Sequence, residues 1–263
     1  MLPIAGETFG FFVSVWYDNR NSGRFNNIKT TEKYKETSIA MKIVIMKNGP
    51  FVVEKDVPVK EVDSLADKDG GVSDYEVQND ISDPGTEKYL CRCGHSKNKP
   101  FCDGQHIKIG FDGAETNNRK KFLEKAALYR GKVYDALVSE DLCAVGRFCD
   151  VGIGMGEALG SSAESDVKNV IHAGCGCPGG RIVLVDKNTG QTIEPELEKE
   201  IFLINDVPEA HLGPIYVRGG IQVIGADGFE YEIRNRMTLC RCGESSNMPF
   251  CDASHLNCEH MRV

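Results

Sequence analysis

Two short stretches of the chain each contain four potential metal ligands. The first loop, Cys91–His106, reads C-R-C-G-H-S-K-N-K-P-F-C-D-G-Q-H, and the second loop, Cys240–His255, reads C-R-C-G-E-S-S-N-M-P-F-C-D-A-S-H. Both follow the spacing C-x-C-x8-C-x3-H, and thiolates and imidazoles gathered this closely are typical metal ligands. The repeat therefore predicts two equivalent metal sites. Their ligands would be Cys91, Cys93, Cys102 and His106 in the first loop, and Cys240, Cys242, Cys251 and His255 in the second.

Cysteine grouping favours metal binding over disulfides. Of the 11 cysteines, six lie in the two loops, and four more form the close pairs Cys143/Cys149 and Cys175/Cys177. A disulfide framework is typical of small secreted domains, whereas clustered Cys and His in a reducing compartment are more often metal sites. Directly paired C-x-C cysteines would also form a strained disulfide.

Composition indicates a globular protein and excludes several classes. The chain has 263 residues with 41% hydrophobic content, which is sufficient for a core, and its formal net charge of -8 argues against a nucleic-acid binder. No apolar run approaches the ~20 residues that span a bilayer. The apolar stretch Phe9–Trp16 lacks a preceding basic segment, so a secretory signal is not expected. We therefore expect a cytoplasmic protein without a membrane or nucleic-acid partner.

The repeat extends beyond the two loops. Residues 49–53 (G-P-F-V-V) parallel residues 213–217 (G-P-I-Y-V), and Val57 and Val59 correspond in spacing and type to Ile221 and Val223. Short strands broken at Gly49-Pro50 and Pro58 are expected from Met41 onward, and Tyr89-Leu90 should lead as a strand into the first loop. A hairpin is expected at 221–234, around Ala226-Asp227-Gly228. One such unit is too small to bury a core by itself, so the two units are expected to pack together.

The remaining segments are expected to be less regular. Residues 1–40 are rich in turn formers and are predicted to be a tail, and the acidic segment Asp63–Asp83 a loop or irregular hairpin. Asn117–Arg130 has a helical apolar stripe, Ser162–Ala173 a second helical pattern, and Arg181–Asp186 reads as a buried strand.

These patterns predict a mostly β protein with some α (α+β). We divide it into the tail 1–40, a first unit 41–112, a partly helical middle segment 113–212 and a second unit 213–263. The two units would be pseudo-symmetric and pair through short strands within a monomer.

Spacing alone leaves the metal open between zinc and an iron–sulfur cluster. Both accept a Cys3His ligand set. Structural zinc sites usually pair ligands at C-x2-C or wider, because one turn wraps one ion. The C-x-C and C-x3-H pairs of these loops could instead serve two irons bridged by sulfide, which favours a cluster.

The string C-x-C-x2-S-x3-P-x-C-D-G-x-H resembles the signature of the CDGSH iron–sulfur family. The first loop departs from the family signature only where Gln105 replaces serine or threonine, and the second where Ala253 replaces glycine. Neither change removes a ligand. The resemblance implies one 2Fe–2S cluster per loop, with the C-x-C cysteines on one iron and the third cysteine and histidine on the other. It also implies that small members pair as homodimers, a need that a tandem chain meets internally.

Further loop residues have physical roles on this interpretation. Asp103 and Asp252 are suited to cap the turn that carries the histidine, and Pro100 and Pro249 to fix the turn before the third cysteine. Phe101 and Phe250 would shield the cluster, although ordinary packing explains them equally well. Four other residues in and near the loops have no matched partner between the two loops. Lys97 and Lys99 are replaced by Ser246 and Met248 at the equivalent positions of the second loop. His95 is expected on the surface, and Cys258 in the C-terminal tail.

The middle cysteines form a weaker pattern. Cys143-x5-Cys149 followed by Cys177-Pro178 resembles a divergent ferredoxin-like single-cluster module, but the position where that module often has histidine is Val145. Cys175 could supply a fourth thiolate. A third cluster or metal at Cys143, Cys149, Cys175 and Cys177 therefore competes with the alternative that these are buried structural cysteines.

Three functions remain open at this stage. The first is single-electron transfer or redox sensing through two 2Fe–2S clusters, with a redox partner protein. The second is cluster storage and transfer to an acceptor protein, and the third a structural zinc role. No catalytic constellation is recognisable, so we do not expect an enzyme.

Overall fold

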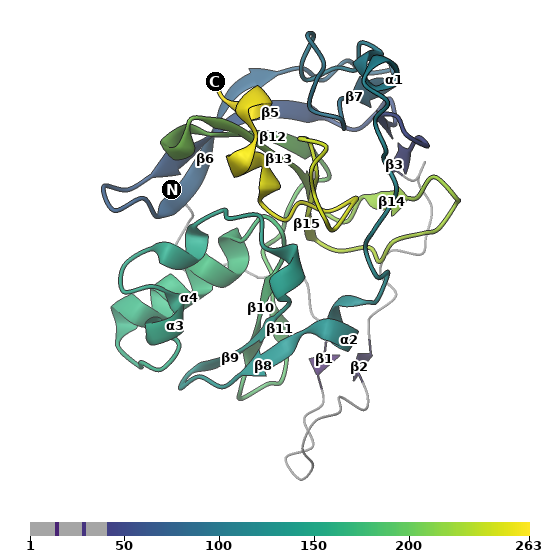
Figure 1. Cartoon of the computed structure of the whole chain (residues 1–263). Coiled ribbons are helices and arrows are strands. Elements are labelled where there is room, and N and C mark those ends of the chain that lie inside the picture. The colour runs from purple at the N-terminus through teal and green to yellow at the C-terminus, as the bar shows by residue number, and fades with distance from the viewer. Residues whose placement is uncertain (1–13, 16–27, 30–40) are drawn as a thin grey trace.

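Residues 14–15, 28–29 and 41–263 are described by the computed structural model of the chain (Figure 1). The predicted tail, 1–40, lies outside the described residues except for β1 (Ser14–Val15) and β2 (Ile28–Lys29), which pair antiparallel. From Met41 onward the chain forms three larger sheets connected by short helices and loops, so the predicted α+β class is confirmed.

The largest sheet has five strands in the order β15-β13-β12-β5-β6. These are β5 (Val59–Ala66), β6 (Val72–Asp80), β12 (Ile201–Asp206), β13 (His211–Arg218) and β15 (Arg236–Leu239). Neighbours are antiparallel except β12 and β5, which run parallel. The antiparallel β5–β6 pair covers most of Asp63–Asp83, so of the two predictions for this segment, loop or irregular hairpin, the hairpin is confirmed. The pairing is irregular at two register shifts.

The second sheet has four strands in the order β14-β3-β4-β7. They are β3 (Lys42–Ile45), β4 (Phe51–Val53), β7 (Lys88–Leu90) and β14 (Gln222–Ile224). The strand breaks predicted at Gly49-Pro50 and Pro58 separate β3, β4 and β5, and the predicted strand at Tyr89-Leu90 is β7.

Each of these sheets takes strands from both ends of the chain. β5 from the N-terminal half pairs parallel with β12, and β14 from the C-terminal half pairs parallel with β3. Register matches as well: Phe51 is opposite Leu90 as Ile215 is opposite Leu239. Val59 and Val223, which correspond in the repeat, also occupy corresponding positions in the two parallel strand pairs. Val59 is opposite Ile201, and Val223 is opposite Ile43. Neither half can therefore complete its sheet without the other.

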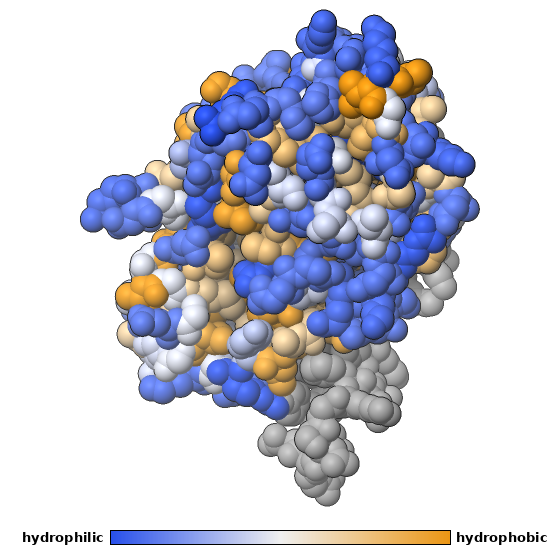
Figure 2. Space-filling view, viewed as in Figure 1, coloured by the Kyte–Doolittle hydropathy of each residue, from blue (hydrophilic) through white to orange (hydrophobic). Residues whose placement is uncertain are grey.

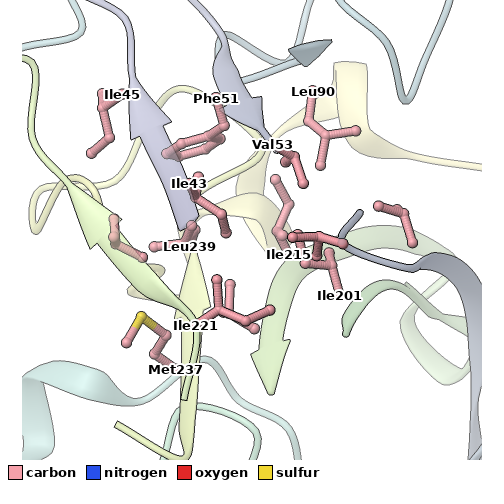
Figure 3. Close-up of a cluster of buried hydrophobic side chains, with 14 of the residues drawn as sticks. Ile43, Ile45, Phe51, Val53, Leu90, Ile201, Ile215, Ile221, Met237 and Leu239 are labelled. Carbon is pink, nitrogen blue, oxygen red and sulfur yellow. The ribbon is translucent and has the colours of Figure 1, made fainter. Parts of the chain in front are cut away.

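One hydrophobic core lies between the two sheets (Figure 3). β3, β4 and β7 contribute Ile43, Phe51 and Leu90, and the C-terminal half supplies further core side chains. The latter include Ile201, Leu203, Ile215, Ile221, Val223, Met237 and Leu239, all 0–1% exposed. Alternation along β3 and β4 explains this arrangement, because residues two apart share a face of a strand.

The middle segment forms the third sheet, in the order β11-β10-β9-β8. Its strands are β8 (Ala127–Tyr129), β9 (Tyr134–Val138), β10 (Ile182–Asp186) and β11 (Thr192–Ile193). α3 (Met155–Ala158) and α4 (Glu164–Gly176) pack on one face, and α2 (Phe122–Lys125) on the other (Figure 1). The predicted helix at Ser162–Ala173 and strand at Arg181–Asp186 are thus confirmed as α4 and β10.

The predicted helix over Asn117–Arg130 is mostly wrong. Only α2 is helical, and its last turn ends at Ala126, which has extended backbone angles. The next residues form β8, in which Leu128 pairs with Leu137 of β9. β9, which follows β8 closely in the chain, pairs with the backbone groups of β8, and an apolar stripe in the sequence does not reveal that pairing.

The predicted hairpin at 221–234 is present only in part. β14 is a strand, but its return consists of the isolated bridge between Ile224 and Glu230. The other edge of β14 pairs in parallel with β3 of the first unit.

Five 3-10 turns and one further helix complete the described structure. The helix is α1 (Gln105–Lys108), and the turns are η1 (Glu140–Leu142), η2 (Phe148–Asp150), η3 (Val207–Glu209), η4 (Ser254–Asn257) and η5 (Glu259–Met261). Within the described ranges, no helix combines the length and apolar character needed to cross a bilayer.

The shared core predicts that both halves unfold together. Leu90→Ala and Leu239→Ala should each lower the free energy of unfolding by about 2–5 kcal/mol, because both side chains are at most 1% exposed. Urea unfolding followed by circular dichroism should show a single transition of these two sheets for either variant. Leu65→Ala, at a position 41% exposed, is the matched control and should cost less than about 1 kcal/mol. Two separate transitions in the Leu90 variant would contradict a shared core.

Candidate metal centres

Each metal loop begins at the end of a buried strand. β7 ends at Leu90 and leads directly to Cys91, and β15 ends at Leu239 and leads to Cys240. The loop then folds back on that strand: the Cys91 N–H donates to Pro100 O (2.8 Å) and the Cys102 N–H to Tyr89 O (2.7 Å). The second loop repeats both bonds, from Cys240 to Pro249 O (2.8 Å) and from Cys251 to Thr238 O (2.9 Å). This return brings the third cysteine close to the first two.

The potential ligands of each loop lie in two close pairs. Sγ of Cys91 is 3.8 Å from Sγ of Cys93, and Sγ of Cys102 is 3.3 Å from Nδ1 of His106. The second loop has the same pairs, Cys240/Cys242 at 3.6 Å and Cys251/His255 Nδ1 at 3.5 Å. Two sulfurs on one tetrahedral metal lie about 3.8 Å apart, and a sulfur and an imidazole nitrogen about 3.5 Å apart, given metal–ligand bonds of about 2.3 and 2.0 Å. Each pair therefore fits one tetrahedral metal ion.

The donors divide into pairs rather than larger groups. Among the described residues, no three or more His, Cys, Asp or Glu side chains are arranged around a point where one ion could be held. Each loop thus presents one thiol–thiol pair and one thiol–imidazole pair, all eight side chains being those that the sequence singled out.

The C-x-C thiols share a proton unequally. A hydrogen bond from Cys93 lowers the pKa of Cys91 to about 6, and the same bond raises the pKa of Cys93. In the second loop a hydrogen bond from Cys242 lowers the pKa of Cys240 to about 7, and the pKa of Cys242 is raised. One thiol of each pair is therefore readily ionised near neutral pH. Metal binding to the pair releases the remaining proton.

Asp103 and Asp252 hold the ends of their loops together. The Asp103 carboxylate accepts from the backbone N–H of Lys97 (2.9 Å) and of Gln105 (3.0 Å), the first residue of α1. These two bonds lower the pKa of Asp103. Asp252 accepts in the same way from Ser246 N (2.8 Å) and Ser254 N (3.1 Å). The predicted capping role thus holds for the turn that carries the histidine, although the residue at the cap position itself is Gly104 or Ala253.

Two serines of the repeated string, Ser96 and Ser245, stabilise the same turns. The Ser96 hydroxyl donates to Phe101 O (2.6 Å) and accepts from Asn98 N (3.0 Å). Ser245 makes the equivalent bonds to Phe250 O and Asn247 N. Serine occupies this position in both copies of the loop, and this repetition indicates a shared structural role. Phe101 and Phe250 pack against the shared core, which supports the packing explanation over a shield.

The arginine inside each C-x-C pair is a feature to which the sequence interpretation assigned no role. Arg92 is 1% exposed and donates to three carbonyls, Gly49 O (2.8 Å), Gly113 O (2.9 Å) and Met46 O (3.0 Å). Burial lowers the pKa of Arg92, while the charges of Glu115 and of Cys240 in the other loop oppose that shift. The first loop therefore places a buried cation near the second site.

Arg241 is the equivalent residue of the second loop. It is 5% exposed, donates to Ile204 O (3.3 Å) and has a buried Nε without a partner. Burial lowers the pKa of Arg241 to about 10, and the charges of Glu61 and of Cys91 in the first loop oppose that shift. Each site thus lies in the field of the other loop's arginine.

The two loops contact each other directly. Gly94 and Gly243 both have positive φ, and a Cβ on Gly94 would lie 2.4 Å from Cys242 O, one on Gly243 2.7 Å from Cys93 O. Only glycine allows this approach. His95, expected on the surface, is instead half-buried and stacks on His260, with ring centroids 4.1 Å apart. His260 Nε2 bonds Cys242 O (2.9 Å), so the C-terminal residues join the two loops.

The two sites differ in exposure. Cys102 and His106 are partly exposed, whereas Cys251 is 3% and His255 2% exposed. Burial lowers the pKa of His255 to about 4. The middle segment covers the second loop: Thr116 Oγ1 donates to Ser246 O (2.7 Å) and Asn247 Nδ2 donates to Asp141 O (2.6 Å). Two sites with the same ligands therefore have different access to solvent.

Cys258 is not the tail residue that the sequence predicted. It is 7% exposed and packs in one cluster with Cys240, Cys242, Met248 and Met261. Its thiol donates to Ser254 O (3.2 Å) within the turn that follows the second loop. The 3-10 turns η4 and η5 fold the C-terminus back onto the loop, a return that the isolated Cys258 could not indicate.

The middle cysteines are all free thiols of intermediate exposure. Cys143, Cys149 and Cys177 act together on the pKa of Arg181, which their charges and that of Glu140 raise against the effect of burial. Cys149 and Cys177 also pack on the same hydrophobic cluster, and Cys175 lies in α4. Burial raises the pKa of Cys149 to about 12 and of Cys175 to about 11, so these two thiols are protonated at neutral pH.

Comparison with protein-family models matches the chain to the iron-binding zinc finger of CDGSH type. It matches the chain twice, over residues 48–107 and 212–256, and each match contains one metal loop. Neither the search of curated proteins nor that of solved structures gave a match. The chain thus has two regions that match the CDGSH-type iron-binding domain, one around each metal loop.

The difference between Gly104 and Ala253 allows a matched test of loop strain. Both residues have left-handed backbone angles, φ 81° and φ 70°, and a Cβ on Gly104 would meet nothing within 4 Å. Ala253→Gly should therefore raise the free energy of unfolding by up to about 1 kcal/mol, and Gly104→Ala lower it by about 1 kcal/mol. Urea unfolding of the two variants measures both. Shifts of the same sign would contradict the backbone explanation.

Proposed function

We propose that the chain binds two 2Fe–2S clusters, one in each metal loop, and uses them for single-electron transfer or redox sensing. The observation that carries this proposal is the division of each loop's donors into two pairs, each spaced for one tetrahedral metal. A binuclear cluster needs two such pairs, whereas structural zinc draws four ligands to one ion. The two matches to an iron-binding family support the same conclusion.

The residues present fit this cofactor. Cys91 and Cys93 would hold one iron, and Cys102 and His106 the other, with Cys240/Cys242 and Cys251/His255 in the same roles at the second site. The bound cluster supplies a centre that accepts one electron. A neutral imidazole in place of a thiolate removes negative charge, which raises the reduction potential relative to an all-cysteine site. The buried Arg92 and Arg241 act in the same direction, because a nearby cation favours the more negative reduced state.

We also infer that the two units form an internal pseudo-symmetric pair, so that the functional form is a monomer. The reciprocal parallel pairings of β5 with β12 and of β14 with β3 support this inference. The contacts of Gly94 and Gly243 with the opposite loop support it further.

A second function, cluster transfer, is supported by the partial exposure of Cys102 and His106. The two functions differ in a direct experiment on protein purified without oxygen. Electron transfer predicts that dithionite bleaches the visible absorption and that air restores it without loss of iron. Incubation with a cluster-free ferredoxin should then move less than about a tenth of the iron. Transfer of most of the iron would instead establish the carrier function, and a colourless zinc protein would refute both.

Acid should release the two clusters at different rates. Ligation requires an unprotonated imidazole, so protons compete with iron for the histidines. Because burial lowers the pKa of His255 to about 4, that ring stays neutral between its unfolded pKa near 6.5 and pH 4. Stability linked to His255 is therefore lost as pH falls through this window. The partly exposed first site should bleach first.

Stopped-flow absorption after a jump to pH 5 tests this order. We expect two phases, with His106→Cys removing the fast phase and His255→Cys slowing the other. His172→Gln is the control, since His172 lies in α4 and its Nε2 is 3.0 Å from Val72 O. Unchanged kinetics in both cysteine variants would rule out histidine ligation.

A further inference from the structure

The first site opens onto a patch with an apolar centre. Ile107 is 77% exposed, Ile109 41% and Met46 45%, and all three lie at or beside α1 or the β3–β4 turn. Figure 2 shows apolar residues gathered at the upper right, where Figure 1 places α1. His106 belongs to the same surface, because a Cβ on Gly49 would lie 3.1 Å from Cβ of Met46 and 3.8 Å from Nε2 of His106.

Lysines surround this apolar centre. Lys47, Lys97 and Lys108 are exposed, and within the described part of the chain none of them has an ion-pair partner. The nearby carboxylates are Asp103 and Asp112, and both accept bonds from backbone N–H groups of their own turns. The rim therefore has a positive balance in a chain whose formal net charge is -8.

The second site has no comparable surface. The positions equivalent to the three lysines in the repeat are occupied by His211, Ser246 and Asn257. Cys251 and His255 are 3% and 2% exposed, beneath the middle segment. The basic and apolar surface is thus specific to the site whose ligands reach the surface.

We propose that the first-site patch, which comprises Met46, Lys47, Lys97, Ile107, Lys108 and Ile109, docks an acidic electron-transfer protein. The inference rests on the proposed function and assigns the first site as the point where a single electron enters or leaves, with no bond made or broken. Exposed apolar side chains at the centre supply contact area, and the lysines steer an acidic surface toward it. The negative charge of the rest of the chain repels such a partner elsewhere, which orients the encounter.

A second copy of this chain is a poorer occupant. A symmetric contact through the patch would place the lysines of one copy opposite those of the other, and like charges across an interface are unfavourable. An acidic partner meets no such penalty.

Electron exchange with an acidic 2Fe–2S ferredoxin, measured by stopped flow on the cluster-loaded chain, tests the proposal. Lys47→Glu/Lys108→Glu should lower the second-order rate constant by about tenfold or more at low ionic strength and flatten its dependence on salt. The matched control is Lys68→Glu/Lys199→Glu, which changes the same charge at two other exposed lysines and should alter the rate less than about twofold. Ile107→Ser should weaken docking while the salt dependence stays that of the unaltered chain.

The outcomes separate this proposal from the function on which it rests. If the unaltered chain carries no cluster, the proposed function fails. If all variants keep the visible absorption and the two lysine pairs have equal effects, docking at the patch is overturned and cluster binding stands. Faster exchange with a basic cytochrome than with the acidic ferredoxin would also overturn it. So would a dimer in sedimentation analysis that Ile107→Ser converts to monomer.

Discussion

Mutual burial of two incomplete sheets is the constraint on which the rest of the structure depends. Each half of the chain supplies strands with one strongly apolar face, and neither half has enough of them to exclude water from that face. Ile43 and Leu90 find their packing partners in Ile215 and Leu239, about 150 or more positions away. The exchanged parallel strands β5 and β14 lock this arrangement, since each completes a sheet of the opposite half.

The metal loops inherit their geometry from that core. Both start at the last residue of a buried strand and return to it through paired backbone bonds, so their donor pairs rest on a fixed base. Gly94 and Gly243 bring the loops against each other, and the buried Arg92 and Arg241 each interact electrostatically with a cysteine of the opposite loop. The middle segment makes the two sites differ in exposure, because it covers Cys251 and His255 while Cys102 and His106 remain partly exposed. The second site is therefore buried, and the first site is partly exposed.

Local patterns predicted what local forces decide. The repeated ligands, the capping role of Asp103 and the strand breaks before Phe51 and Val59 all follow from spacing and from proline and glycine stereochemistry. Features that depend on how separate segments pair or pack were missed. Leu128 belongs to a strand because β9 offers an edge, and Cys258 is buried because the C-terminus folds back on the second loop. The unequal exposure of the two loops depends on the segment between them, so it could not be predicted from the loop sequences.

We propose that each loop holds a binuclear iron–sulfur centre on two donor pairs. Iron and acid-labile sulfide, measured per chain in protein purified without oxygen, test it most directly. We expect two irons and two sulfides for each loop, and loss of one such set when Cys91 and Cys93 are both changed to serine. One zinc ion per loop with no sulfide would contradict it.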